Sequence, residues 1–181
     1  HPDTISSFNS QPDNNLTNWT GAWADYIKTY LWTLYVYEKF GGQPFIWDLV
    51  HNPNNSMLGY QQTLDGLGYT VTTADVFGDW GVANFLDDET VDDGRYGYTG
   101  DDLPAFNTFF THTSYPATYT SVVQPHGTDY IRLQNFNGPL AIRFDGYDTR
   151  EFRFTLMAID PVLPTLVLPV PLDALQAGEA D

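Results

Sequence analysis

The chain has 181 residues, of which 42% are hydrophobic and 16% aromatic, so it can bury the core of one ordinary domain or two small ones. Its 23 Asp and Glu outnumber its 7 Lys and Arg and give a net charge of −16. This charge disfavours nucleic acid and membrane surfaces as partners, because both are anionic. The absence of cysteine excludes disulfides, thiolate zinc sites and cysteine nucleophiles.

Both ends of the sequence predict a processed or partial chain. It begins with His1 and Pro2 rather than methionine, and it has no recognisable signal peptide. At the other end, residues 169–181 follow a predicted strand as though a domain were interrupted. No apolar run approaches the ~20 residues that a membrane helix requires. We therefore expect a fragment of a longer protein that does not enter a membrane.

The first half of the chain predicts a helical subdomain. Residues 1–20 are rich in Asn, Ser, Asp and Pro, which predicts a polar lead-in made of turns. A first helix then has Thr20 as its expected N-cap and Gly41-Gly42 as its stop. Its apolar stripe has three-and-four spacing and consists of Trp23, Tyr26, Ile27, Tyr30, Leu31 and Leu34.

Three more helices are expected in this half. Pro44 suits the first turn of a second helix that extends to residue 50, and Ser56 caps a short third helix. Thr72 and Asp75 have the spacing of a capping box at the start of a fourth. The result is a subdomain of about four helices over residues 21–102.

The second half of the chain has the two-residue alternation that is typical of strands. Residues 87–102 form an acidic, glycine-containing loop that ends the helical subdomain, and beyond it the apolar residues alternate. Strands are expected at 119–123, 128–133, 140–144 and 152–158, with an edge strand or strap at 161–171. The fold class is therefore expected to be α+β, a helical subdomain followed by an antiparallel β-sandwich-like domain, cut short, over residues 103–181.

No complete catalytic pattern is present. A zinc hydrolase needs three protein ligands, and the helical His-Glu-x-x-His arrangement that supplies two of them is absent. The four histidines, His1, His51, His112 and His126, are isolated from one another and are interpreted as loop or surface residues. The sequence also lacks a serine-nucleophile elbow and a phosphate-binding glycine loop. We expect this chain alone to be inactive as an enzyme and to hold no zinc.

The acidic loop is the strongest local chemical signal, and two interpretations of it stay open. Calcium takes six to eight oxygens from such loops, which makes Asp87, Asp88, Asp92 and Asp93 candidate calcium ligands. The spacing does not match an EF-hand, and a solvated acidic loop is the interpretation that the composition slightly favours over a calcium site. Glu89, Asp101 and Asp102 belong to the same acidic run.

Several segments resemble the secreted bacterial zinc metallopeptidases of the gluzincin type, in particular the hyicolysin-like and immune inhibitor A-like groups. In the helical half the matching segments are DYIKTYL (25–31), EKFGG (38–42), FIWDLV (45–50), ADVFGDW (74–80), VANFLDD (82–88) and YGY (96–98). In the strand half they are TDYI (128–131) and GPLAIRF (138–144). The resemblance implies the helix that follows the zinc site, the start of a following β-domain and a secreted, extracellular location.

The same resemblance implies one site residue. Tyr26 takes the place of a tyrosine that donates a hydrogen bond to the oxyanion of the tetrahedral intermediate. Thr29 replaces the glycine of that motif, and Asp25 replaces the histidine of the secreted relatives. Tyr26 also lies on the apolar stripe of its helix, which predicts a core position. The zinc ligands and general base are expected upstream of His1.

Three functional hypotheses follow. The first is a fragment of a secreted zinc-metallopeptidase-like protein, whose parent hydrolyses peptide bonds through a zinc-activated water. The second is a non-enzymatic extracellular binding or assembly module on a degenerate peptidase scaffold. The third is a calcium-dependent carbohydrate binder. The expected partner is the upstream portion of the same protein or an identical copy.

Overall fold

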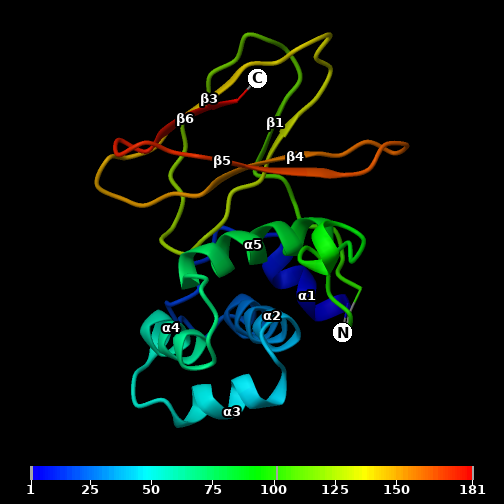
Figure 1. Cartoon of the computed structure of the whole chain (residues 1–181). Helices are drawn as coiled ribbons and strands as arrows, with labels where there is room; N and C mark the ends of the chain where they lie inside the picture. The colour runs from blue at the N-terminus through cyan, green and yellow to red at the C-terminus, as the bar shows by residue number, and fades with distance from the viewer. Residues whose placement is uncertain (1, 101, 181) are drawn as a thin grey trace. The chain divides into compact units, whose positions relative to one another are not determined.

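The structure is a computed structural model that describes residues 2–100 and 102–180, with side chains from Ile5 onward. His1 and Asp101, which the interpretations of the histidines and the acidic loop include, lie outside the described residues. The chain forms two compact units. A helical unit extends to Phe110 and includes Tyr119–Ile131, and a strand unit contains Thr111–Thr118 and the chain from Arg132 onward. The predicted α+β class is confirmed (Figure 1).

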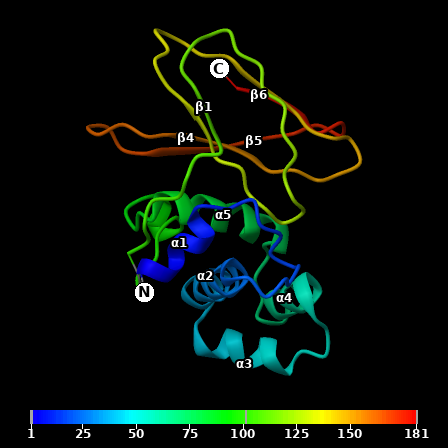
Figure 2. The same cartoon turned by 180° about the vertical axis from the view of Figure 1, so that it is seen from behind.

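The four expected helices are all present, and α2 lies between α5 and α3 in both views of the helical unit (Figures 1 and 2). The helical elements are α1 (Pro2–Asn9), α2 (Trp23–Lys39), α3 (Gln43–His51), α4 (Ser56–Gly66), α5 (Thr73–Leu86) and a 3-10 turn (Asp92–Gly94). The capping box at Thr72 is confirmed, because its hydroxyl accepts from the Asp75 amide at 3.1 Å. Thr20 is not the N-cap of α2, which begins after Ala22.

Helix α1 corrects the prediction that residues 1–20 contain only turns. Its apolar content is limited to Ile5 and Phe8, which are three residues apart and lie on one helix face. Both side chains are buried. The helix is therefore stabilised by tertiary packing rather than by the propensities of its polar residues.

The core of the helical unit is aromatic and centred on α2 and α5. Trp80 contacts Phe8, Trp32 and Phe77, with ring centroids 5.6–5.9 Å apart. The buried residues of α2 recur at helical spacing and include Leu31, Trp32, Tyr35 and Val36. This packing joins α1, α2 and α5 into one unit.

The segment after α5 folds back onto the helices through specific contacts. The Tyr98 hydroxyl donates to Asn84 Oδ1 at 2.7 Å inside the core, and the Tyr98 amide donates to Asp87 Oδ1 at 3.0 Å. Gly97 lies so close to the backbone of residues 88–89 that a Cβ at this position would overlap it. The neighbouring segments VANFLDD (82–88) and YGY (96–98) thus form one local structure.

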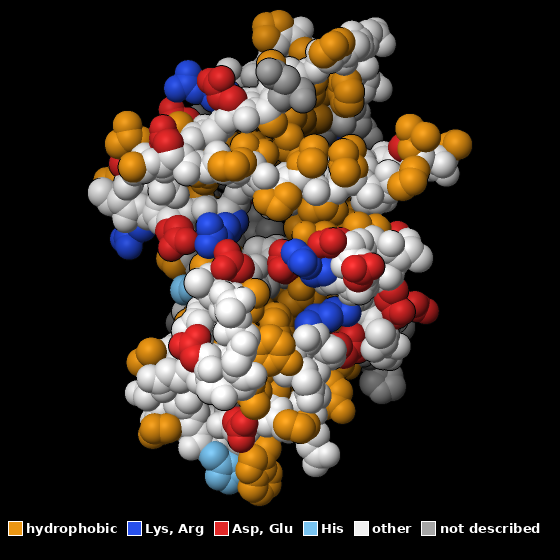
Figure 3. Space-filling view, viewed as in Figure 1, with side chains coloured by type: hydrophobic (Ala, Val, Ile, Leu, Met, Phe, Trp, Pro, Cys, Tyr) orange, Lys and Arg blue, Asp and Glu red, His pale blue; other side chains and the backbone are white. Residues whose placement is uncertain are grey.

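The described residues form three two-stranded sheets, in the order β1-β2, β3-β6 and β4-β5. The strands are β1 (Phe110–His112), β2 (Ile131–Leu133), β3 (Ile142–Asp145), β4 (Phe154–Ala158), β5 (Leu166–Val170) and β6 (Ala177–Ala180). The pairs β3-β6 and β4-β5 are antiparallel. Exposed hydrophobic side chains gather over β4 and β5 (Figure 3).

The strand predictions are confirmed at β2 to β5 and wrong at residues 119–123, which form no strand. Val122 is 80% exposed, so this stretch has no buried face to stabilise a pleated conformation. Strands β1 and β6 were not expected. β6 has the sequence Ala-Gly-Glu-Ala, which lacks the β-branched and aromatic residues that indicate a strand.

Candidate functional site

Tyr26 lies on the exposed face of α2, so the prediction that it belongs to the core is wrong. Its side chain is 51% exposed, and its ring contacts Trp19 at 4.7 Å and Trp23 at 5.5 Å between centroids. Tyr30 is also exposed one helical turn further on. We call Trp19, Trp23, Tyr26 and Tyr30 the aromatic patch.

The aromatic patch presents Tyr26 to anything that contacts this face. A phenol donates a directional hydrogen bond while staying neutral, which is the chemistry that oxyanion stabilisation requires. The patch itself contains no metal ligand or general base. Within residues 2–100 and 102–180, no three His, Cys, Asp or Glu side chains are grouped to hold a metal ion, so these residues do not fit a zinc site.

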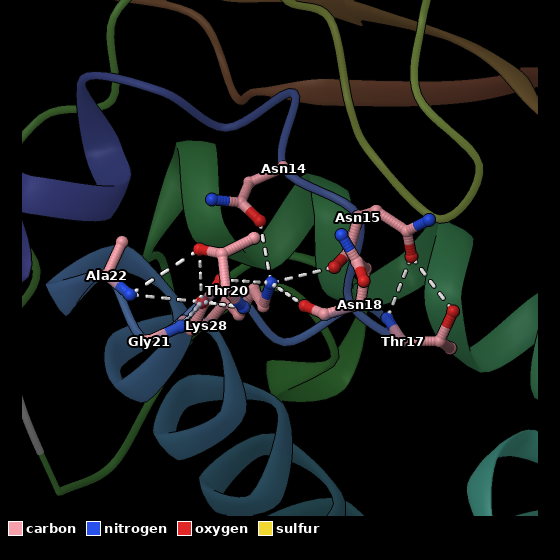
Figure 4. A network of polar contacts seen from close by, with 9 residues as sticks. Asn14, Asn15, Thr17, Asn18, Thr20, Gly21, Ala22 and Lys28 are labelled. Atoms are coloured by element: carbon pink, nitrogen blue, oxygen red, sulfur yellow. Dashed lines mark hydrogen bonds and ion pairs between the residues drawn. The ribbon is translucent and has the colours of Figure 1, made fainter.

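A buried ion pair within α2, Asp25–Lys28, is hydrogen-bonded to the segment that precedes the helix. The Lys28 ammonium is buried and donates to Asn14 Oδ1 (2.6 Å), the Asn15 carbonyl (2.7 Å), the Asn18 carbonyl (2.7 Å) and Asp25 Oδ1 (2.6 Å). Figure 4 shows these three asparagines around the Lys28 side chain. We call these contacts, with those of Asp25, the Lys28 network.

Asp25 completes the Lys28 network from its other oxygen. Asp25 Oδ2 accepts from the Thr20 hydroxyl and amide at 2.7 Å and from the Gly21 amide at 2.9 Å. Burial alone would raise the pKa of Asp25, but hydrogen bonds from Lys28 and Thr20 outweigh it and hold the pKa well below its usual range. Asp25 is therefore a buried anion that anchors the loop before α2, and it is inaccessible to a substrate.

The network explains why Thr20 does not cap α2. The Thr20 hydroxyl donates to the Asp25 carboxylate instead of accepting a hydrogen bond from a helix amide. The same carboxylate accepts hydrogen bonds from the amides of Gly21 and Ala22. These bonds hold the loop that contains Trp19. The Lys28 network thus positions Trp19 against Tyr26.

Three of the four candidate calcium ligands, Asp87, Asp88 and Asp92, point their oxygens at separate partners. Asp87 accepts from the amides of Tyr98 and Leu103, whereas Asp88 accepts from the amide and hydroxyl of Thr90. The two hydrogen bonds from Thr90 lower the pKa of Asp88. Asp92 pairs with Arg95 at 3.1 Å, and Asp93 is exposed with a φ of 55°. A calcium site here stays a prediction of the sequence.

A melting curve tests the calcium hypothesis. Because the carboxylates bond to backbone and hydroxyl donors and do not converge, we expect addition of ~1 mM CaCl2 to move the Tm by less than about 1 °C. Differential scanning calorimetry with and without EDTA measures the shift. A clear rise in Tm that EDTA reverses would establish a calcium site instead.

The described histidines are scattered. His51 Nδ1 is 2.7 Å from the Trp47 carbonyl within α3, His112 lies in β1, and His126 adopts a left-handed backbone conformation in a loop. Partial burial lowers the pKa of His126. None of them contributes to a metal-binding group among the described residues.

The helical unit contains a cavity of about 400 Å³ lined by residues 10–13, residues 107–109 and Asp129. We call it the Asp129 cavity. Backbone hydrogen bonds connect its walls: the Asn107 amide donates to the Asn9 carbonyl at 3.0 Å, and the Phe109 amide donates to the Tyr130 carbonyl at 2.7 Å. Sequence reasoning missed this cavity, because its walls come from three segments that are far apart in the chain.

Asp129 is the unusual group in this cavity. Its Oδ1 is buried without a hydrogen-bond partner, and its Oδ2 accepts only a long bond of 3.3 Å from the Ser121 hydroxyl. Burial raises the pKa of the Asp129 carboxyl, and the negative charge of Asp13 raises it further. A carboxylate kept in such an environment destabilises the fold, which is typical of residues retained for binding rather than stability.

We expect Asp129→Asn to stabilise the protein at neutral pH, by about 2 °C in Tm. The raised pKa of Asp129 means that the native state binds a proton more readily than the unfolded state. The ionised carboxylate therefore lowers the free energy of unfolding at pH values above the native pKa, and this is the penalty that the substitution removes. It disappears as the pH falls toward the unfolded-state value of about 3.9. Melting curves of wild type and variant should therefore converge on acidification. Asp93→Asn, at an exposed position, provides the control and should leave the Tm unchanged.

Comparison of the chain with protein-family models, curated proteins and solved structures finds no match. In the part of the chain that the structure describes, no helix has both the length and the apolar character needed to cross a bilayer.

Proposed function

We propose that this chain is the part of a secreted zinc-metallopeptidase-like protein that follows the zinc-binding helix. The supporting observation is the exposure of Tyr26 on α2, beside Trp19 and Trp23. A tyrosine that donates to a reaction intermediate must face a substrate, and a core tyrosine would have argued against this role. The chain is not catalytic alone in this proposal, because its zinc ligands and general base belong to residues upstream of His1.

The packing of the resembling segments adds support. DYIKTYL contributes Leu31 to the core, ADVFGDW contributes Trp80, and VANFLDD is bonded to YGY through Asn84 and Tyr98. Segments that resemble one family in the same order thus build a single core. A role in forming one wall of a catalytic cleft would explain why they occur together.

The test compares the 181-residue chain with the gene product that also includes the residues encoded upstream of His1. We expect the longer protein to contain about one zinc per chain by elemental analysis and to cleave an unfolded protein substrate, while the chain alone does neither. In the longer protein, Tyr26→Phe should lower kcat about 10²–10³-fold. Tyr37→Phe is the matched control, since Tyr37 is an exposed tyrosine of the same helix outside the patch, and should keep full activity. A longer protein without zinc would overturn the proposal.

A second candidate is a non-enzymatic binding or assembly module. Its specific support is that Trp19 and Trp23 are 55% and 69% exposed, and exposed tryptophans are enriched at binding hot spots. Analytical ultracentrifugation distinguishes the two proposals. An assembly of the longer protein that lacks zinc and dissociates on Trp23→Ala would favour the module, whereas a zinc-containing protein whose activity depends on Tyr26 would favour the peptidase.

A further inference from the structure

We propose that the Asp129 cavity binds a basic peptide side chain, lysine or arginine, with its charged group at Asp129 and Asp13 and its aliphatic stem on Phe109. This site lies in the helical unit, involves none of the aromatic patch and does not depend on the peptidase proposal.

The cavity is preorganised. Three of its connections are backbone hydrogen bonds between segments distant in sequence, including one from the Thr128 amide to the Pro12 carbonyl at 3.2 Å. The Gln124 amide also donates to Asp13 Oδ1 at 2.6 Å and fixes that side chain. A ligand that enters therefore meets walls that need no reordering, which reduces the entropic cost of binding.

The charge of the lining selects a cation. Two carboxylates, Asp13 and Asp129, line the same cavity, and burial together with the negative charge of Asp13 raises the pKa of Asp129. No Lys or Arg is among the lining residues. Neither carboxylate takes part in any of the ion pairs found among the described residues. An ammonium or guanidinium in the cavity would offset the negative charges of Asp13 and Asp129 and donate to Asp129 Oδ2, whose bond from Ser121 is long at 3.3 Å.

The apolar part of the lining suits the stem of a basic side chain. Phe109 is half exposed and its ring is held by Tyr119 at 6.3 Å, so the ring can cover methylene groups and attract a cation to its face. Pro12 contributes a second apolar wall. A volume of about 400 Å³ is ample for one long side chain.

Other ligands fit this lining less well. A divalent cation requires more oxygens than two carboxylates provide, and the described residues contain no group of three or more acidic or histidine side chains arranged for a metal. A neutral sugar would gain hydrogen bonds but would leave the repulsion between Asp13 and Asp129 in place. The positive charge of the ligand is thus the property that the cavity recognises.

The experiment uses the whole 181-residue chain and 15N-1H NMR at pH 7. The probes are Nα-acetyl-lysine methylamide and Nα-acetyl-arginine methylamide, and the uncharged isostere Nα-acetyl-norleucine methylamide is the control. We expect the charged probes to shift the amide signals of residues 10–13 and 107–109 in a saturable way, and norleucine to leave them unchanged. Equal shifts with norleucine, or shifts with glucose or CaCl2 but not with the lysine probe, would overturn the proposal.

Substitutions in the lining test whether the lysine probe binds in the Asp129 cavity. Asp129→Asn should weaken binding of the lysine probe about tenfold. Because Asp129→Asn is also expected to stabilise the fold, its loss of binding would not reflect unfolding, and the dispersion of its spectrum checks this. Phe109→Leu keeps an apolar wall but removes the aromatic face, and should weaken binding to a smaller extent. Asp93→Asn is the matched charge control. Equal weakening by Asp93→Asn and Asp129→Asn would attribute the effect to net charge and contradict the proposed site.

Discussion

Replacing Lys28 with methionine is expected to lower the free energy of unfolding by about 3–5 kcal/mol. The substitution keeps most of the side-chain volume but leaves the Asp25 carboxylate buried without a counter-ion. It also removes the donor for Asn14 Oδ1 and for the carbonyls of Asn15 and Asn18. Urea titration followed by circular dichroism at 222 nm measures the change in the helical unit.

The pH dependence of the same variant identifies the cause. In the wild type the lowered pKa of Asp25 stabilises the native state fully above the unfolded-state value of about 3.9, and this contribution is lost as the pH falls through the native pKa. Without Lys28, burial is opposed only by the hydrogen bonds from the Thr20 segment, so the pKa of Asp25 should be higher than in the wild type and the variant should lose less stability on acidification.

Two further variants complete this test. Adding Asp25→Asn to Lys28→Met removes the unpaired charge and should recover part of the loss at neutral pH. Lys39→Met, at the other end of α2, serves as the control. The Lys39 ammonium is 4.0 Å from Glu38, farther than the 2.6 Å between Lys28 and Asp25, and its side chain is more exposed than that of Lys28. A loss at Lys39 as large as the loss at Lys28 would contradict the role assigned to the Lys28 network.

Trp80→Ala is expected to cost about 3–5 kcal/mol, because it opens a large void at the centre of the aromatic core. Phe8, Trp32 and Phe77 all contact the Trp80 ring, and they come from α1, α2 and α5. Removal of the Trp80 ring therefore removes packing contacts among all three helices. The same urea titration reports the loss, and the variant should also show increased binding of a hydrophobic dye.

Trp47→Ala is the matched control for Trp80→Ala. Trp47 is 64% exposed on α3, so its replacement should change the free energy of unfolding by less than about 0.5 kcal/mol. Similar losses in the two variants would mean that Trp80 does not organise the core.

Periodicity predicts the helices of this protein well, because α2 to α5 each have apolar residues at helical spacing together with a stop or capping signal. Helix α1 has only Ile5 and Phe8 to indicate it, which is too short a pattern to outweigh its polar neighbours. Strand β6 forms by pairing with β3 and has little intrinsic strand propensity. Elements that depend on tertiary contacts are the ones that the sequence does not indicate.

The candidate sites show the same difference between features that local sequence patterns indicate and features that depend on tertiary contacts. Tyr26 could be placed on α2 from the sequence, but its exposure could not, because the apolar stripe of α2 is wider than the face that the core covers. The Asp25–Lys28 pair has the i, i+3 spacing of an ordinary surface ion pair. Its burial results from the loop of residues 14–22, which no local pattern predicts. The Asp129 cavity depends on three distant segments and has no local signal at all.

Under the proposal that this protein works outside the cell, the Lys28 network has a further consequence. Loops rich in carbonyl and carboxylate oxygens are commonly ordered there by calcium, and they lose their structure when the ion is removed. In this chain the oxygens of Asn14, Asn15, Asn18 and Asp25 surround an ammonium group that is covalently attached to α2. Such a cation cannot be chelated, diluted or exchanged, so the surface built on this loop should keep its shape whatever the ionic composition of the surroundings.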